Sequence, residues 1–244
     1  MKRALSLVLL SLLVLPATTG LTQTPTGVLR IRVRVKADDA APLRGLARKR
    51  FFLAPGTLEQ NRALIEAIER QPLVSRDCYY RKLGASQALI DWLKTSDCES
   101  VYCREVQQEF IAGPKAVPEF ATAFAVSQKE FGGDETARKW ITTNLDQNIR
   151  DGFYRDRQKA IAALLSQSTV LSVMTDRNGT AYFTDLGPGT YVLSNVIPAE
   201  VGQTLVTWNC EVQVKSGELP YLISNRKDRL VKCVGVEKPI PACE

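Results

Sequence analysis

The spacing of hydrophobic and polar residues changes twice along the chain. Residues 28–36, VLRIRVRVK, alternate with a period of two, which is typical of a β-strand with one buried face. Residues 46–56, LARKRFFLAPG, follow a turn and predict a second strand. From residue 57 to about 167 the apolar spacing is helical, and from residue 168 onward it returns to that of strands.

Several helices are predicted between residues 57 and 167, separated by Gly and Pro. One is expected near residues 99–112, where Glu105 and Glu109 would share a face. Helical spacing places the aromatic side chains of this region in a core rather than in a cofactor pocket. These aromatic residues include Phe120, Phe124, Phe131, Trp140 and Phe153.

Two turns divide the late strands. The segment DRNG, residues 176–179, predicts a tight hairpin turn because Asn-Gly readily adopts positive φ, and GPG at 187–189 turns the chain again. We expect Tyr191 to bury its ring and to hydrogen-bond through its hydroxyl near this corner. The residues interpreted as structural turn residues are Asn178, Gly179, Pro188, Gly189 and Tyr191.

The order of these segments indicates a discontinuous sheet domain. A two-stranded hairpin is not stable alone in water, so the two early strands must pair with the late ones. The sequence therefore predicts an α+β protein, a discontinuous antiparallel β-sandwich with an inserted all-helical domain. The predicted segments are a signal peptide (1–20), a β-sandwich domain (27–56 and 168–236), a helical domain (57–167) and a disulfide-pinned tail (237–244).

A family pattern lies between residues 175 and 193, in the form TDxNGxxxFxxLxPGxYxL, preceded at 42–53 by PLRGLARKRFFL. It resembles the carboxypeptidase-regulatory-like domains of the transthyretin-like, or prealbumin-like, sandwich group, over about 80 residues. The resemblance implies a seven-stranded, usually extracytoplasmic sandwich that serves as a spacer, an assembly aid or a glycan-binding module. Such domains are not usually catalytic. The helical region stands where the family has a short loop, and the resemblance implies no activity for it.

The first 20 residues, MKRALSLVLLSLLVLPATTG, have the pattern of a secretory signal peptide with cleavage near Gly20. An uncleaved membrane anchor is the alternative. No later segment is long and apolar enough to span a membrane, so the cleaved chain would not be membrane-spanning. We therefore expect a secreted or periplasmic protein.

Six cysteines follow this segment, and in an exported protein an even number predicts disulfides. There is no CxxC pair and no His, so no metal site is expected. Three cysteines precede residue 168 and three follow it, which requires at least one bridge between the helical region and the C-terminal region. The cysteines are Cys78, Cys98, Cys103, Cys210, Cys233 and Cys243.

The positive charge of the chain is concentrated in one early segment. The chain has 32 Lys and Arg against 26 Asp and Glu, and residues 27–50 hold eight of the cations against two acids. Alternation places four of these cations on one face of the first strand, namely Arg30, Arg32, Arg34 and Lys36. This row is the candidate binding site for anionic polymers, although an ordinary solvated face or a face covered by the helices is the alternative.

The absence of His and of known catalytic motifs limits the classes of function that the chain can have. Without His, nucleophilic catalysis of the Ser-His or Cys-His type is excluded, and no GxSxG, HExxH, Walker or Rossmann motif occurs. No cofactor and no nucleic-acid partner are expected. The leading interpretation is a non-catalytic binding or scaffold protein that contacts a cell-envelope component or anionic glycan. Two alternatives remain: a carboxylate-dependent hydrolase with a site where sandwich and helices meet, and a structural subunit of an envelope assembly.

Overall fold

A computed structural model describes residues 26–72, 74–95, 98–166 and 169–243, so the predicted signal peptide, residues 1–20, lies outside the described residues. No helix in these ranges is long and apolar enough to cross a bilayer. The strands are β1 (Gly27–Val35), β2 (Arg44–Gly45), β3 (Arg50–Pro55), β4 (Leu171–Met174), β5 (Thr180–Leu186), β6 (Gly189–Ser194), β7 (Ala199–Val201), β8 (Thr204–Thr207), β9 (Asn209–Val214), β10 (Gly217–Ser224), β11 (Cys233–Val234) and β12 (Val236–Pro239). The helices are α1 (Arg62–Glu69), α2 (Arg76–Lys82), α3 (Gln87–Thr95), α4 (Pro118–Phe131), α5 (Asp134–Trp140) and α6 (Phe153–Leu165).

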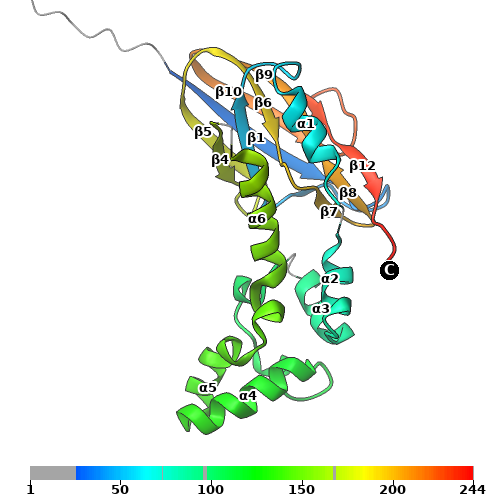
Figure 1. The fold of residues 1–244 in the computed structure, drawn as a ribbon, viewed down its shortest axis with the longest axis vertical. Coiled ribbons are helices and arrows are strands. Elements are labelled where there is room, and N and C mark those ends of the chain that lie inside the picture. Colours follow the sequence, from blue (N-terminus) through cyan, green and yellow to red (C-terminus); the bar gives the residue numbers. More distant parts are fainter. Residues whose placement is uncertain (1–25, 73, 96–97, 167–168, 244) are drawn as a thin grey trace, which may run out of the picture.

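Strands from both ends of the chain pair in the same sheets, within a fold that mixes helices and sheets (Figure 1). In the five-stranded sheet, β1 is central and pairs with β10, β5 and β2. The four-stranded sheet has the order β4-β3-β6-β9, and a small third sheet has the order β12-β8-β7. The predicted pairing of early with late strands is therefore confirmed, while the exact domain boundaries stay a prediction.

The prediction of a purely antiparallel sandwich is wrong for the central pair of strands. β1 runs parallel to β10, from Gly27 beside Gly217 to Arg34 beside Ser224, and β10 runs parallel to β11. Adjacent parallel strands cannot be joined by a tight turn and need a long connection. Between β1 and β10 the connection is most of the chain, so no local turn imposes an antiparallel direction.

The turn at residues 176–179 carries the chain from one sheet to the other. β4 pairs with β3, whereas β5 pairs with β1, so the predicted hairpin pairing is wrong although the turn itself forms. One carboxylate oxygen of Asp176 accepts hydrogen bonds from the backbone N–H groups of Asn178 and Thr180, both at 2.8 Å. β4 and β5 each pair instead with a longer strand of their own sheet, β3 and β1 respectively.

A second crossing joins β5 to β6 through residues 187–189. The residue with positive φ near this crossing is Asp185, at 57°, rather than Gly187 or Gly189. The Tyr191 hydroxyl donates to the carbonyl oxygen of Gly187 at 2.8 Å, and its ring packs against the core from a half-buried position. These contacts tie the end of the crossing to the start of β6.

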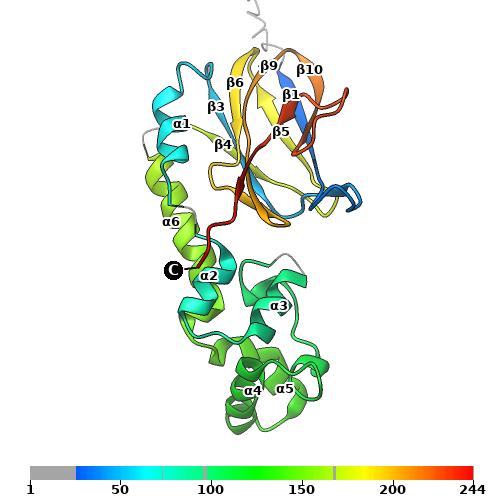
Figure 2. The same cartoon turned by 90° about the vertical axis from the view of Figure 1, so that its right-hand side faces the viewer.

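One hydrophobic core fills the space between the five-stranded and the four-stranded sheet, which lie face to face (Figure 2). Trp208 lies at its centre with no exposed surface, and its ring nitrogen donates to the Ser224 carbonyl oxygen at 3.0 Å. Its ring contacts Phe51, with the ring centroids 5.9 Å apart. The alternate residues of β1 complete the core with zero exposure: Leu29, Ile31, Val33 and Val35.

The helices form two groups (Figures 1 and 2). α1 and the C-terminal part of α6 lie against the outer face of the four-stranded sheet, where Ile68, Phe52 and Val196 share a small core. The other helices enclose a separate core around Tyr80, Trp92 and Phe120, beyond the ends of the strands. The region 57–167 therefore covers one sheet face and also forms a helical unit of its own.

The helix predicted near residues 99–112 does not form. Instead, two short turns of 3₁₀ helix occupy Val101–Cys103 and Gln108–Phe110. Cys98 and Cys103 are joined by a disulfide with their Cα atoms 6.0 Å apart. Side chains five residues apart on an α-helix point about 140° away from each other, so this bridge is incompatible with a helix here. As a result, Glu105 and Glu109 do not share a helix face.

The other two disulfides follow the parity argument. Cys78 of α2 is bonded to Cys243 of the C-terminal tail, which confirms a bridge between the helical and the C-terminal region. Cys210 is bonded to Cys233 within the late strands. Three disulfides are consistent with an extracytoplasmic protein, since such bonds persist in oxidising compartments.

Gly179 provides a test of this packing. Its φ is +76°, and an added Cβ would lie 2.3 Å from the Val33 carbonyl oxygen in β1. Gly84 has nearly the same φ, +74°, but nothing lies within 4 Å of the added atom. We expect Gly84→Ala to cost roughly 1–2 kcal/mol from backbone strain alone. Gly179→Ala should cost about 2 kcal/mol more, because β1 must move.

Thermal and urea unfolding of both variants would measure the difference. Equal losses in the two variants would show that the turn does not pack closely on β1.

Candidate functional site

The four cationic residues predicted as a row lie on the outer face of the five-stranded sheet. Their apolar neighbours in β1 point into the core, so alternation sends Arg30, Arg32, Arg34 and Lys36 outward. We call these four side chains the basic face. In Figure 2 the sheet that carries them lies on the side of the molecule away from α1 and α6. Within the described residues, the sheet layer therefore separates the basic face from these two helices.

The partners of the basic face are all local. Arg30 forms an ion pair with Glu218 of the adjacent β10, with Nε 3.2 Å from the carboxylate oxygen, and both side chains are about half exposed. Arg34 donates to the Leu43 carbonyl oxygen at 2.9 Å, and Lys36 to the Asp39 carbonyl oxygen at 3.5 Å. The contacts seen among the described residues thus do not support the alternative in which the helical acids neutralise this row.

The basic face contains two kinds of cation. Arg34 and Lys36 hold the loop that follows β1, so part of their charge serves the fold. Arg32 is exposed, and in the described part of the chain its side chain has neither an ion pair nor a hydrogen bond. Exposed pairs such as Arg30 with Glu218 contribute little stability and exchange easily with other partners. Arg30 and Arg32 are therefore the residues that are available to a ligand.

An aromatic side chain lies beside the basic face. Tyr182 of β5 is directly opposite Arg30 in the strand register, and half of its surface is exposed. Residues opposite one another in neighbouring strands point to the same side of a sheet. The sequence pattern contained this signal, since Tyr182 stands between the buried Ala181 and Phe183, but only the register shows that it neighbours Arg30.

A polar cleft of 870 Å³ lies where the sheets meet α2 and α3. Its walls come from the β2 region, the turn at 176–179, α2, the end of α3, the connection between β7 and β8, and the tail around Cys243. The carboxylates of Asp77 and Glu200 are in this cleft, and both are held by cations. Glu200 accepts the backbone N–H of Arg76 at 2.7 Å, and Asp77 forms an ion pair with Lys94.

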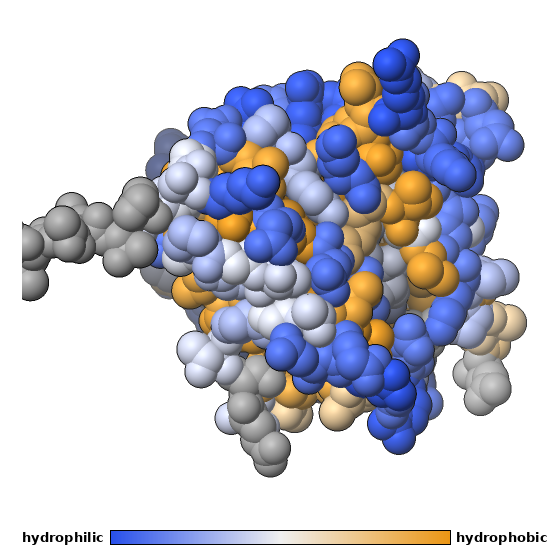
Figure 3. Space-filling view, turned by 90° about the horizontal axis from the view of Figure 1, so that it is seen from above, coloured by the Kyte–Doolittle hydropathy of each residue, from blue (hydrophilic) through white to orange (hydrophobic). Residues whose placement is uncertain are grey.

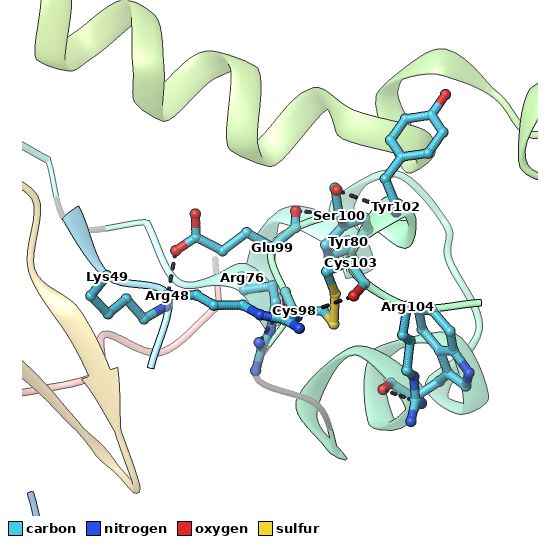
Figure 4. The surroundings of a disulfide bond; sticks show 11 residues. Arg48, Lys49, Arg76, Tyr80, Cys98, Glu99, Ser100, Tyr102, Cys103 and Arg104 are labelled. Atoms are coloured by element: carbon cyan, nitrogen blue, oxygen red, sulfur yellow. Dashed lines mark hydrogen bonds and ion pairs between the residues drawn. A yellow bond between two sulfur atoms is a disulfide. The ribbon is translucent and has the colours of Figure 1, made fainter. Parts of the chain in front are cut away.

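A partly buried ionic cluster joins the sheets to the helices; Figure 4 shows Glu99 with Lys49 and Arg76. Glu99 lies between Lys49, just before β3, with their closest N and O atoms 3.0 Å apart, and Arg157 of α6, at 3.4 Å. Burial alone would raise the pKa of Glu99, but the charges of Lys49, Arg157 and Arg76 outweigh it and lower the pKa from 4.5 to about 2. The carboxylate is therefore ionised near neutral pH and fixes the helical region against the sheets.

The neighbouring cations of the ARKR segment have structural partners as well. Arg48 donates to the Cys103 carbonyl oxygen at 3.1 Å, and Arg50 donates to the Ser172 hydroxyl at the same distance. The cationic excess of residues 27–50 is therefore divided between an exposed strand face and internal contacts. The sequence does not show which cations are exposed and which are hydrogen-bonded, because the partners come from distant parts of the chain.

Two aromatic residues predicted as core lie on the surface. Phe131 at the end of α4 and Trp140 at the end of α5 stack with their centroids 5.9 Å apart and their planes inclined by 25°. They are 43% and 50% exposed. The prediction is wrong for this pair, whereas Phe120 and Phe153 are buried as expected. Both are the last residues of their helices, and the buried residues of α4 and α5 all precede them.

Paired acids suited to hydrolysis are not found in the described residues. Glu105 and Glu109 pair with Arg138 and Lys115 respectively, and Asp77 is paired with Lys94. In the same part of the chain, no group of three or more Cys, Asp or Glu side chains is placed to hold a metal ion.

Comparison with known proteins adds little to this picture. No protein-family model matches the chain, and no curated protein matches its sequence. Among solved structures, a Pseudomonas aeruginosa protein described as a "putative carbohydrate binding protein" is similar over 83% of this chain and 90% of its own, with 15% sequence identity and a TM-score of 0.31. At that TM-score the similarity carries no argument about this chain.

The Glu99 cluster predicts a specific acid sensitivity. Because the folded-state pKa is depressed, the stabilisation is complete above pH 4.5 and is lost as the pH falls toward 2. It amounts to about 3 kcal/mol at most. Glu99→Gln should destabilise the protein at pH 7, since Lys49 and Arg157 lose their shared partner, and should flatten the dependence of stability on pH below 4.5.

The measurement is the unfolding midpoint of wild type and variant from pH 7 to pH 2. Glu59→Gln is the matched control, because Glu59 forms an exposed pair with Arg62. A Glu99 variant that keeps the acid sensitivity of wild type would refute this role.

Proposed function

We propose that this chain is an extracytoplasmic, non-catalytic protein that binds acidic glycans of the cell envelope through the basic face. One observation carries the proposal: Arg30 and Arg32 point outward from a central strand, on the side away from α1 and α6, next to the exposed ring of Tyr182. The strand is rigid, since it is hydrogen-bonded on both sides. A rigid row of cations requires little ordering when a ligand binds.

The chemistry of the surface favours an acidic sugar over a simple polyanion. A guanidinium group pairs with a carboxylate through two parallel hydrogen bonds. A tyrosine ring offers a flat apolar surface with a polar tip, which suits the apolar face of a sugar ring. Arg30 and Tyr182 are opposite one another in register, so one acidic sugar residue can meet both groups.

The proposal includes the fold family. We assign the two facing sheets to the transthyretin-like group, as a carboxypeptidase-regulatory-like domain interrupted by helices. The family-pattern residues support this, because the segments 176–179 and 187–189 both lie where the chain passes from one sheet to the other. Domains of this group are not usually catalytic, which agrees with the paired state of the carboxylates in the junction cleft.

The alternative of an envelope-assembly subunit would be favoured by a large exposed apolar patch. Seen from the strand end opposite α4 and α5, hydrophobic residues are interspersed with hydrophilic ones (Figure 3). This end of the molecule therefore does not offer the single apolar surface that a permanent interface requires.

Retention on an acidic glycan tests the proposal. We expect the oxidised protein to be retained on an immobilised uronic-acid polymer and to be released by salt. The double variant Arg30→Gln, Arg32→Gln should bind about tenfold more weakly or worse, because each charge-assisted hydrogen bond contributes roughly 1.5–3 kcal/mol. Arg34 is left in place because it holds the loop after β1.

The control removes the same charge from the other side of the molecule. Arg62→Gln, Arg70→Gln alters two exposed residues, the first of α1 and the one directly after it, and α1 covers the four-stranded sheet. It should be retained as wild type is. Equal loss in both double variants would mean that net charge alone drives binding, and the basic face would then have no special role.

Tyr182→Ala separates glycan recognition from general attraction to anions. Loss of the ring should weaken binding to the uronic-acid polymer about fivefold or more. The change leaves the charge unaltered, so the salt dependence of retention should stay as in wild type. Isothermal titration with uronic-acid oligosaccharides at two salt concentrations measures both quantities. Unchanged affinity would remove Tyr182 from the site and would favour a non-sugar polyanion.

A further inference from the structure

The cleft between the sheets and helices α2 and α3 carries a second set of cations with a different arrangement. Its two acids are already neutralised at the base of the cleft. Arg76 is 7% exposed, donates to the Cys98 carbonyl oxygen at 2.9 Å and lies 3.9 Å from a carboxylate oxygen of Glu200. Asp77 is paired with Lys94 and also lies 3.9 Å from Arg76 Nε.

The base of the cleft still has unused hydrogen-bonding capacity. Arg76 Nε and one carboxylate oxygen of Asp77 are buried without a hydrogen-bond partner. An unpaired buried donor on a charged group costs free energy, which a ligand atom or an ordered water can recover. Arg76 lies 3.9 Å from each of two carboxylates, which is longer than a hydrogen bond. Its guanidinium can therefore donate to a further anionic group.

The rim of the cleft has cations from both of its walls. Arg44 and Arg177 come from the sheet side, and Arg81 comes from α2. All three are exposed, and the Arg81 side chain donates a hydrogen bond to the side-chain oxygen of Gln87 at 3.3 Å. In the described ranges of the chain, no ion pair involves any of them. Like charges that face one cleft focus its potential and attract an anion that can lie between them.

The lining indicates the chemical class of the ligand. The described residues around the cleft include no aromatic side chain, so stacking on a base or a sugar ring is not offered there. Hydrogen-bonding groups line it instead, including Ser75, Thr95 and Gln203. A volume of 870 Å³ is larger than a single phosphate requires. A small molecule with several acidic groups suits this lining, because cations stand on both walls of the cleft.

We propose that this cleft binds a multivalent anion, with phosphate or carboxylate groups that bridge Arg44 and Arg177 on the sheet side to Arg81 on the helix side. The site is distinct from the basic face and does not depend on glycan binding there. Its two walls belong to segments held together by the Glu99 cluster and by the Cys78–Cys243 bridge, so the backbone positions that carry these cations are fixed relative to one another.

Calorimetric titration of the oxidised protein tests this site, with tripolyphosphate and citrate as probes at constant ionic strength. We expect saturable binding of at least one probe, and either one supports the proposal while showing which acidic group is preferred. The double variant Arg44→Gln, Arg177→Gln should bind the probe about tenfold more weakly or worse. Arg81→Gln, changed from the opposite wall, should weaken the same probe.

The double variant Arg30→Gln, Arg32→Gln is the matched control, because it removes the same charge from the basic face. It should bind the probe as wild type does, while the cleft variant should still be retained on the uronic-acid polymer. This crossed design distinguishes failure of the cleft from failure of the basic face. The cleft proposal is overturned if neither probe binds, or if both double variants lose the probe equally. Unweakened binding by the Arg44, Arg177 variant would also overturn it.

Discussion

The partly buried carboxylate of Glu99 is the contact on which the arrangement of the sheets and helices depends. A carboxylate removed from water must be matched by cations, and here the cations come from separate segments. Lys49 belongs to the sheet side and Arg157 to α6, so one acid can be satisfied only when helices and sheets are in their observed positions. Its backbone carbonyl also accepts the Tyr80 hydroxyl at 3.2 Å. Together with the Cys78–Cys243 bridge, this requirement positions the walls of the neighbouring cleft.

Some of these structural features can be predicted from the sequence and others cannot. Alternation fixed the inward and outward sides of β1, because every second residue must be apolar when one face is buried. The reciprocal hydrogen bonds of Thr57 and Gln60 before α1 are likewise readable from their spacing. The direction of β1 relative to β10 was not readable, since strands at opposite ends of a chain carry no turn that sets their orientation. The ion pair of Lys49 could not be predicted either, because its partner Glu99 lies 50 residues away in the sequence.

Failures in the helical region have one physical origin. Helical periodicity describes a segment in isolation. It does not show whether a disulfide prevents the helix, or where the helix ends relative to the core. Cys98 and Cys103 force a compact loop where the pattern predicted a helix. Phe131 and Trp140 satisfy the spacing of core residues, yet they lie where the helices end and the core has no further residues to cover them. The candidate site had a similar gap, since the position of Tyr182 beside Arg30 depends on register between strands far apart in the sequence.

The parallel pairing of β1 with β10 has a consequence for the order of assembly. β1 is the first strand of the described chain to be synthesised, and its long neighbour begins at residue 217. The five-stranded sheet therefore cannot be completed until nearly the whole polypeptide has emerged. Contacts between such distant residues close slowly, because a large loop must be ordered first. Until then the side of β1 that faces β10 stays unpaired, and unpaired strand edges make incompletely folded chains prone to aggregation.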